Sequence, residues 1–337
     1  MISFCNDYCI GACEQVLQRL QAINNTQFNG YGLDEICDNA KQNIRKVLQH
    51  DNCDIHFAVG GTQANTIVIK SILRPHEAVI ACDSGHINVH ETGSIEASGH
   101  KVLTAPHYNG KLLASDVERI VLTHKDEHMV KPAMVYISNA TEYGTVYHKD
   151  ELEALRAVCD KYNLIFFLDG ARLGAAFMST ENDVTMKDLA RLCDVFYIGG
   201  TKNGALFGEA IVIINDQIKK DFRYIMKQHG AMLAKGWLLG VQFDVLFEDG
   251  LYFDLAKHAV EMSQYLQQEL MKKQVPFLIQ SSTNQIFPIV SNAHMQQLAK
   301  DFKFEIWEAV DDNHTCIRFV CSFATTKEQV DILLNAF

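Results

Sequence analysis

Two side chains that can carry opposite charges, Asp169 and Lys202, each follow a short apolar stretch of the chain. Asp169 comes directly after residues 164–168, which are rich in Ile and Phe, and Lys202 comes shortly after residues 194–200. Continuous apolar runs of this length, stopped by an acid or a glycine, are typical of strands buried on both faces of a parallel sheet. Because ligands of such sheets bind at the carboxyl ends of the strands, we expect the carboxylate and the amine to meet at one edge.

A buried carboxylate needs a partner, because moving a bare charge out of water is costly. Pyridoxal phosphate (PLP) enzymes use this pair of groups: a lysine forms the Schiff base with the cofactor, and an aspartate pairs with its pyridinium nitrogen. The simpler alternative is a buried salt bridge between Asp169 and Lys202 with no catalytic role. The sequence favours PLP, with Lys202 as the Schiff-base lysine and Asp169 as the partner of the ring.

A glycine pair precedes an apolar helix at a second predicted strand end. Gly60, Gly61 and Thr62 follow the mostly apolar residues 55–59 and precede the apolar residues 67–73. Glycines let the backbone approach an anion closely, and a helix start offers free N–H groups and a positive dipole. A tight strand-to-helix turn without a ligand is the alternative, but together with Asp169 and Lys202 the motif predicts a phosphate site.

His86 lies at a third predicted strand end, since it follows the apolar residues 78–81. An imidazole at that position could stack on an aromatic ring or transfer protons. A lone histidine is more often structural, and we interpret His90, His100 and His107 in that way. Position distinguishes His86 from these three, so it is a candidate catalytic residue.

The order of predicted elements indicates an α/β fold. Strands and helices alternate from about residue 53 to residue 214, which predicts a mainly parallel sheet with crossover helices. Helices then dominate residues 216–273, and short strands return at 277–280, 285–290, 304–307 and 315–320. We predict an N-terminal segment (1–30) that packs on the small domain or on a partner, a large cofactor-binding domain (31–245) and a small C-terminal α+β domain (246–337).

Composition excludes several classes of protein. Of 337 residues, 48% are hydrophobic and 21% are charged, and the formal net charge is 30 − 41 = −11, which disfavours nucleic acid and anionic membranes as partners. No apolar run approaches the roughly 20 residues needed to span a bilayer, and the first residues do not resemble a secretory signal. Ten scattered cysteines are typical of a reduced, cytoplasmic protein.

Cys5, Cys9 and Cys13 are evenly spaced and raise the question of a metal site. Thiolates bind zinc and iron–sulfur clusters, but zinc sites usually contain tighter cysteine pairs and a fourth ligand. We therefore interpret these cysteines as small side chains at the start of a helix and predict no metal.

Taken together, these motifs resemble the threonine aldolase/β-eliminating lyase family of fold-type I PLP enzymes. The most specific piece is Leu-Asp-Gly-Ala-Arg-Leu at residues 168–173, and Gly-Gly-Thr-Gln-Ala-Asn at 60–65 is similar to the family's phosphate-binding segment. The resemblance covers nearly the whole chain. It implies an aspartate-aminotransferase-like large domain with a mainly parallel seven-stranded sheet.

The resemblance also implies roles for individual residues around the cofactor. Lys202 would carry the Schiff base, Asp169 would keep the pyridine nitrogen protonated, and His86 would stack on the ring. Arg172 would bind the phenolic oxygen or the substrate carboxylate. The implied cofactor-binding set is Gly60, Gly61, Thr62, His86, Asn139, Asp169, Arg172, Thr201 and Lys202.

Further residues are implied to contact the substrate. Arg318 matches the arginine that binds the α-carboxylate, and His128 matches the spacing of a second active-site histidine. Asn6 stands in the family's early substrate-binding segment. Tyr31 lies in a loop that in the family reaches a neighbouring subunit, which implies a homodimer or homotetramer with shared active sites.

The implied reaction is cleavage of the Cα–Cβ bond of a β-hydroxy-α-amino acid, such as threonine or allo-threonine, to glycine and an aldehyde. Two alternatives stay open at this point. One is another PLP reaction on a small amino acid, namely β-elimination, racemisation or transamination. The other is a binding protein without catalytic activity on the same fold.

Overall fold

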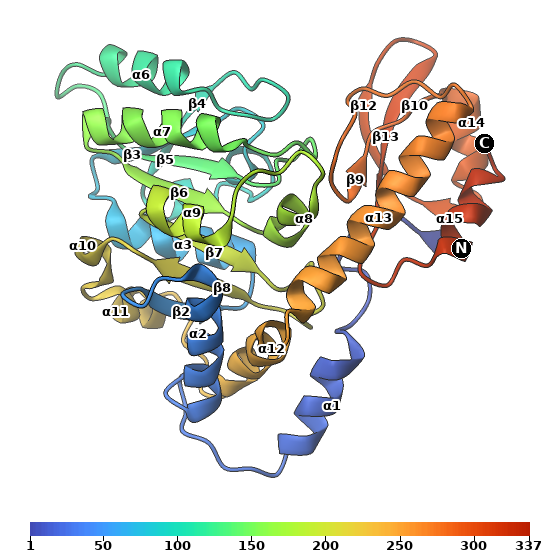
Figure 1. Cartoon of the computed structure of the whole chain (residues 1–337). Coiled ribbons are helices and arrows are strands. Elements are labelled where there is room, and N and C mark those ends of the chain that lie inside the picture. The colour runs from blue at the N-terminus through green and yellow to red at the C-terminus, as the bar shows by residue number, and fades with distance from the viewer.

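A seven-stranded sheet forms the centre of the large part of the molecule in the computed structural model, which describes all residues from 1 to 337. The strand order is β2-β8-β7-β6-β5-β3-β4 (Figure 1). Only β8 runs antiparallel to its neighbours, so the prediction of a mainly parallel sheet is confirmed. The strands are β2 (Asp54–Ala58), β3 (Glu77–Cys82), β4 (Lys101–Ala105), β5 (Lys131–Ser138), β6 (Ile165–Asp169), β7 (Val195–Gly199) and β8 (Glu209–Ile213).

Helices cover both faces of this sheet, as the apolar strands require. Five helices pack against one face of the sheet, and four pack against the other. The first group is α2 (Glu35–Leu48), α6 (Ala114–Thr123), α7 (Lys149–Tyr162), α9 (Met186–Leu192) and α12 (Trp237–Glu248). The second is α3 (Gly61–Ile72), α5 (Ser94–Ala97), α10 (Asp216–Lys219) and α11 (Phe222–Gln228). Two further short helices are α4 (His86–Val89) and α8 (Leu173–Met178).

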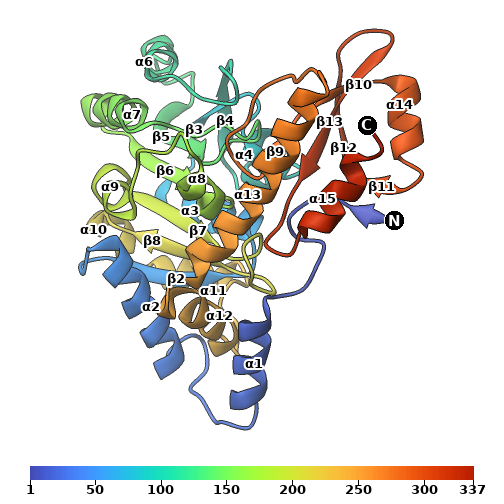
Figure 2. The same ribbon diagram turned by 45° about the vertical axis from the view of Figure 1, so that its right-hand side comes forward.

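A smaller sheet forms a separate part beyond the long helix α13 (Leu251–Lys272), as Figure 2 shows. Its central strand β13 pairs antiparallel with three short strands. The elements are β9 (Gln285–Ile286), β10 (Ile289–Ser291), α14 (Asn292–Leu298), β11 (Phe302–Lys303), β12 (Glu305–Ala309), β13 (His314–Val320) and α15 (Lys327–Leu334). Helix α15 is preceded by the N-cap residue Thr326, which forms a capping box with Gln329: each side chain accepts from the other's backbone N–H.

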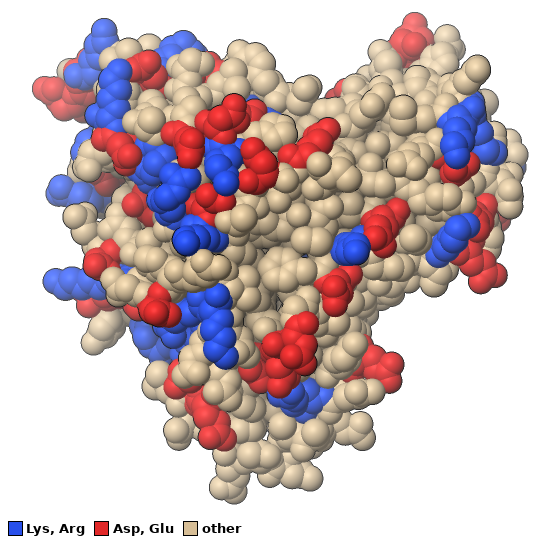
Figure 3. Space-filling model, viewed as in Figure 1, with Lys and Arg blue, Asp and Glu red and all other residues tan.

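The N-terminal segment contacts both parts of the molecule. Strand β1 (Ile2–Ser3) pairs parallel with β11, and the fully buried Phe4 belongs to the core of the small part. The chain then crosses to α1 (Glu14–Ile23), which packs on α12. The lowest part of the molecule in Figure 3, around α1 and the loop before α2, carries no charged side chain at its tip on this face. The boundaries proposed at residues 30 and 245 stay predictions.

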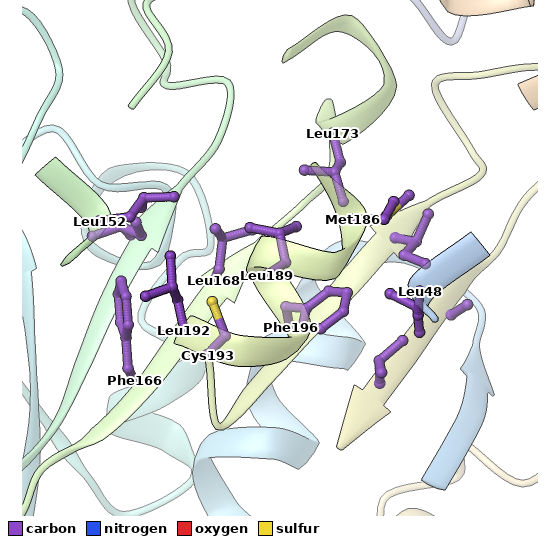
Figure 4. Close-up of a cluster of buried hydrophobic side chains, with 14 of the residues drawn as sticks. Leu48, Leu152, Phe166, Leu168, Leu173, Met186, Leu189, Leu192, Cys193 and Phe196 are labelled. Atoms are coloured by element: carbon purple, nitrogen blue, oxygen red, sulfur yellow. The ribbon is translucent and has the colours of Figure 1, made fainter. Parts of the chain in front are cut away.

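Alternating burial of side chains fixes the register of the strands that end at the predicted site. Phe166 and Leu168 of β6 point to the face covered by α9, whereas Phe167 between them points to the opposite core. Figure 4 shows Leu168 and Phe196 beside Leu189 of α9, and Phe166 beside Leu192 of the same helix. Because both faces of β6 are buried, a shift of one residue would move every side chain to the wrong core, so Asp169 has one possible position.

Some sequence-based expectations differ from the structure. Residues 277–280 form no strand, only a single bridge between Phe277 and Pro288. That proline also divides the predicted strand 285–290 into β9 and β10, because proline cannot donate a hydrogen bond to the sheet. Strand β4, with its exposed Lys101 and Thr104, was not predicted.

The three evenly spaced cysteines do not share a helix face, because α1 begins only at Glu14. Cys13 is buried, Cys9 is exposed, and Cys5 is intermediate. No helix combines the length and the apolar character that crossing a membrane requires.

Candidate active site

A cavity of about 470 Å³ lies at the carboxyl edge of the large sheet, where β5, β6 and β7 end. Residues from the start of α3 and from β13 of the small part complete its wall. The structure therefore brings together side chains that are far apart in sequence. The predicted site residues that line it are Gly60, Gly61, Thr62, His86, Asp169, Arg172, Thr201, Lys202 and Arg318.

The carboxylate of Asp169 is buried and accepts four hydrogen bonds. Oδ2 accepts from the hydroxyl of Tyr136 at 2.6 Å and from the amide of Asn65 at 3.0 Å. Oδ1 accepts from the hydroxyl of Tyr197 at 2.5 Å and from a backbone N–H at 2.9 Å. Burial alone would raise the pKa of Asp169, but the charge of His86 and these hydrogen bonds lower it. A negative charge is thus fixed at this position.

The amine of Lys202 lies in the cavity without an ion pair or a hydrogen bond, and Nζ is 5.9 Å from the centroid of the Tyr8 ring. Burial and the positive charge of Arg172 lower the pKa of Lys202, although Asp7, Asp169 and Glu209 act in the opposite direction. A lower pKa leaves more of the amine unprotonated, which is the form that attacks carbonyl groups.

Glu209 of β8 is a buried acid beside this lysine that was not predicted. Its side chain accepts hydrogen bonds from the hydroxyl of Thr201 at 2.8 Å and from the backbone N–H of Gly200 at 3.2 Å. Burial raises the pKa of Glu209 to about 8. Thr201, predicted to bind the cofactor, therefore has its hydroxyl proton directed at Glu209.

The imidazole of His86 is held in one orientation. Its Nδ1 lies 2.7 Å from Oε1 of Glu91, whose side chain is fully buried. A carboxylate can only accept, so Nδ1 carries a proton, and Nε2 makes no hydrogen bond within the chain. The backbone N–H of His86 donates to Glu142 at 3.1 Å, which ties the start of α4 to the loop after β5.

Arg172 is paired with an acid from the N-terminal segment. Its Nε and Nη2 donate to the two carboxyl oxygens of Asp7 at 2.8 and 3.1 Å, and Nη1 makes no hydrogen bond. Burial alone would raise the pKa of Asp7, but the charge of Arg172 and its hydrogen bonds lower it. This bidentate pair fixes the geometry of the guanidinium and anchors the N-terminal segment over the cavity.

Arg318 reaches the cavity from strand β13. One end of its guanidinium pairs with Glu305, and Nη1 donates to Gln285 at 3.2 Å. The guanidinium carbon also lies 5.0 Å from the centroid of the Trp307 ring. Burial and the charge of Arg172 lower the pKa of Arg318. Two guanidinium groups, each paired with a carboxylate, therefore lie at this end of the cavity.

Four predicted residues do not line this cavity. The side chain of Asn6 accepts one hydrogen bond, from the backbone N–H of Tyr8. Its neighbours Asp7 and Tyr8 contact site residues instead: Asp7 pairs with Arg172, and the ring of Tyr8 lies near Lys202. Asn139 accepts from the backbone of Tyr147.

His128 precedes β5 and is exposed, at the opposite end of an eight-residue strand that spans about 25 Å. The expectation that His128 joins this cavity within its own chain is therefore corrected. Tyr31 is 44% exposed outside the cavity, and its ring contacts the ammonium of Lys227 at 4.6 Å.

Several residues of the site were missed, and some had a signal in the sequence. Tyr136 and Tyr197 lie near the ends of strands that were predicted, so their proximity to Asp169 follows from the strand register. Asn65 lies on α3 within the quoted glycine-rich segment. Asp7, Glu91 and Glu142 had no comparable signal, because loops or short helices position them.

The start of α3 forms the remaining wall. Gly60 has an extended backbone, and a Cβ added there would meet no atom within 4 Å. A Cβ on Gly61 would lie 2.9 Å from the hydroxyl of Tyr197. Thr62 does not cap the helix, because Gly60 is the N-cap residue. No side chain makes a capping hydrogen bond at this helix start. The N–H groups of this helix start are open to the cavity.

This chain is similar to known proteins in sequence and in structure. Residues 6–293 match the family described as beta-eliminating lyase. A low specificity L-threonine aldolase from a Pseudomonas species is 32% identical, covering 97% of this chain and 94% of that protein. A solved structure of threonine aldolase from Leishmania major has 45% identity and a TM-score of 0.98, covering 99% of this chain and 98% of that chain. An aspartate aminotransferase from Thermus thermophilus, at 13% identity and a TM-score of 0.75, shares the fold.

Proposed function

This chain belongs to the β-eliminating lyase family, and from that membership we propose that it is a PLP-dependent lyase for β-hydroxy-α-amino acids. It cleaves threonine and allo-threonine between Cα and Cβ to give glycine and acetaldehyde. The Pseudomonas and Leishmania relatives, both named as threonine aldolases, support this assignment over most of the chain. The observation that carries it is the meeting of Asp169, Lys202 and Arg318 in one cavity.

The residues of the cavity fit PLP. The amine of Lys202 suits the aldehyde of the cofactor, the ionised carboxylate of Asp169 suits its ring nitrogen, and the open helix start at Gly60 suits its phosphate. His86 lies in the same wall and can cover the ring. When bound, PLP accepts the electron pair released as a bond to the amino acid's α-carbon breaks.

The protein's own residues orient the substrate and move protons. Arg318 binds the α-carboxylate. Its guanidinium lies in the cavity wall, and Glu305 and Gln285 hold it there in one orientation. The orientation of the carboxylate decides which bond at Cα is broken. The free Nε2 of His86 takes the proton of the β-hydroxyl, directly or through one water, as the aldehyde leaves. Lys202, with its lowered pKa, returns a proton to Cα.

Product analysis tests this function. Purified protein supplied with PLP is incubated with L-threonine or L-allo-threonine, and the released acetaldehyde and glycine are measured. We expect the two products in equal amounts. Lys202→Ala should abolish the release of acetaldehyde, whereas Lys101→Ala, at an exposed lysine of β4, should not. Pyruvate and ammonia from serine, without acetaldehyde from threonine, would contradict the proposal and favour β-elimination.

The active unit is a homodimer or homotetramer. Tyr8 at the cavity rim and Tyr31 outside it are both exposed in the single chain, at 54% and 44%. Leu17, Leu33 and Leu206 are also exposed around the N-terminal helix and the loop after Lys202. Exposed apolar side chains that include one at the cavity rim, Tyr8, suit contacts with a second copy of the chain.

A further inference from the structure

Glu209 is a buried acid in the wall of the candidate active site. It is 3% exposed and forms no ion pair with a lysine or an arginine. Its two oxygens accept from the hydroxyl of Thr201 and from the backbone N–H of Gly200, so each oxygen keeps one free lone pair. Because it is costly to bury a carboxylate that has no cationic partner, a neutral carboxyl group is the favoured form at this position.

The position of Glu209 is set by strand β8, which begins there. Glu209 pairs with Ala58, two residues before Gly60 at the start of α3. Side chains alternate along a strand, and Ile211, two residues further on, belongs to the core on the α3 side of the sheet. The side chain of Glu209 therefore lies on the face that α3 covers. It lines the same cavity as the open start of that helix.

A phosphate at this helix start would meet a second anion if Glu209 were ionised. Like charges in a buried site repel each other strongly, so a carboxylate here would oppose binding of the cofactor. A protonated carboxyl group has the opposite effect, because its O–H can donate a hydrogen bond to a phosphate oxygen. Only the neutral form of Glu209 is compatible with a phosphate at the start of α3.

The charged and titratable groups around Glu209 agree with a neutral side chain. Burial raises its pKa to about 8; the hydrogen bonds that it accepts and the charge of Lys202 lower the pKa by less, and Asp169 raises it further. Tyr197 of β7 and Tyr252 of α13 also lie near it, and burial together with the charge of Glu209 raises the pKa of both. The first turn of α3 contains no acid. Glu209 is therefore mostly protonated below about pH 8.

We propose, on the basis of the PLP-dependent function above, that Glu209 binds the phosphate group of the cofactor as a neutral acid. Its carboxyl O–H donates to a phosphate oxygen, while the carboxyl group keeps its hydrogen bond from Thr201. Loss of the proton replaces this hydrogen bond by repulsion between two anions. The contribution of the phosphate to cofactor binding therefore depends on one proton of the protein.

Pyridoxal, which is PLP without its phosphate, isolates this contribution. Cofactor-free protein is titrated with PLP and with pyridoxal, and the absorbance change that requires Lys202 gives a Kd for each ligand. Groups that contact the rest of the cofactor, such as Lys202 and Asp169, affect both ligands alike and cancel in the ratio of the pyridoxal Kd to the PLP Kd. This ratio should be nearly constant from pH 7 to 8 and should then fall by up to about tenfold per pH unit, because one proton is linked to binding of the phosphate.

Glu209→Gln provides a neutral side chain that can donate and accept at every pH. Its ratio should match that of the wild type at pH 7 and stay constant as the pH rises. The matched control is Glu328→Gln, the same change at an exposed glutamate of α15, and its ratio should fall as in the wild type.

A constant ratio in the wild type, or an equal fall in Glu209→Gln, would overturn the inference. Tighter binding of PLP by Glu209→Gln at pH 7 would also overturn it, because Glu209 would then be ionised beside the phosphate. If neither ligand gives an absorbance change that requires Lys202, it is the PLP-dependent function that fails.

Infrared absorption detects the protonated carboxyl group directly, since its C=O stretch is separate from the bands of carboxylates and of the backbone. The difference spectrum between the PLP-loaded wild type and PLP-loaded Glu209→Gln should contain this band at pH 8. The band should be stronger with PLP than without it, because the charge of the phosphate raises the pKa of Glu209 further. Its absence from the PLP-loaded protein would show that Glu209 does not bind the phosphate as an acid.

Discussion

The carboxylate of Asp169 depends on two tyrosine hydroxyls that donate to different oxygens. Tyr197→Phe removes one of these donors from a buried, ionised acceptor. A hydrogen bond to a charged group contributes about 1.5–3 kcal/mol, so the free energy of unfolding at pH 7 should fall by about that amount. Urea unfolding measures the change. Tyr224→Phe, at a tyrosine that is 77% exposed, should have no effect, and an equal loss in both variants would contradict the argument.

Buried Glu209 should make stability depend on pH. Its pKa is about 8 in the folded protein, against 4.5 as the ordinary value, because of burial. Between these values the folded state binds more protons than the unfolded state, so the contribution of Glu209 to stability falls as pH rises. The lowered pKa of Lys202 makes its contribution to stability rise with pH, at higher pH values. A variant of Glu209 alone separates the contributions of the two residues.

Glu209→Gln should therefore gain stability relative to the wild type as pH rises from about 5 to 8. Denaturant unfolding of both proteins at several pH values gives the difference. Asp51→Asn, at an exposed acid, should show no trend with pH. A flat difference for Glu209→Gln would mean that the carboxyl is ionised throughout this range.

At the scale of elements, the start of α3 must fit closely against β7. A Cβ on Gly61 would lie 2.9 Å from the Tyr197 hydroxyl, whereas one on Gly60 would meet nothing. Gly61→Ala should cost about 1–3 kcal/mol of unfolding free energy through overpacking, and Gly60→Ala should cost much less. Thermal unfolding without cofactor makes the comparison. Equal midpoints for the two variants would show that Tyr197 moves aside freely.

The sequence predicted those elements whose burial pattern is continuous. The runs before Asp169 and Lys202 are apolar on both faces, and this pattern placed both residues at one edge of a parallel sheet. Arg172 was found, but its partner Asp7 was not, because the two lie 165 residues apart and Asp7 belongs to an irregular loop. Local periodicity carries no information about such pairs, and Glu91 and Glu142 escaped for the same reason.

At the scale of the whole molecule, the N-terminal segment joins the two parts. Phe4 is buried in the small part, and Asp7, three residues later, is paired with Arg172 of the large part. Phe4→Ala should cost about 3–5 kcal/mol and should also weaken binding of PLP, because Asp7 loses its anchor. Unfolding and a PLP titration followed by absorbance measure the two effects.

Ile306→Ala, at a residue of the same part that is 62% exposed, serves as the control and should change neither quantity. If Phe4→Ala destabilised the protein but bound PLP as tightly as the wild type, the two parts would be coupled by other contacts, such as α13.

Self-association should depend on exposed apolar residues of the N-terminal region. Leu17 on α1 and Leu33 before α2 are 47% and 59% exposed, and the tip between these helices carries no charged side chain on the face that Figure 3 shows. The double variant Leu17→Glu/Leu33→Glu places two buried charges in the proposed interface, each costly unless it is paired. Sedimentation should show dissociation toward monomers, with lyase activity falling on dilution because the cavity rim is left open.

Ile332→Glu, at a half-exposed position of α15 in the small part, is the control and should sediment as the wild type does. A wild-type protein that is monomeric and fully active at micromolar concentration would refute a shared active site.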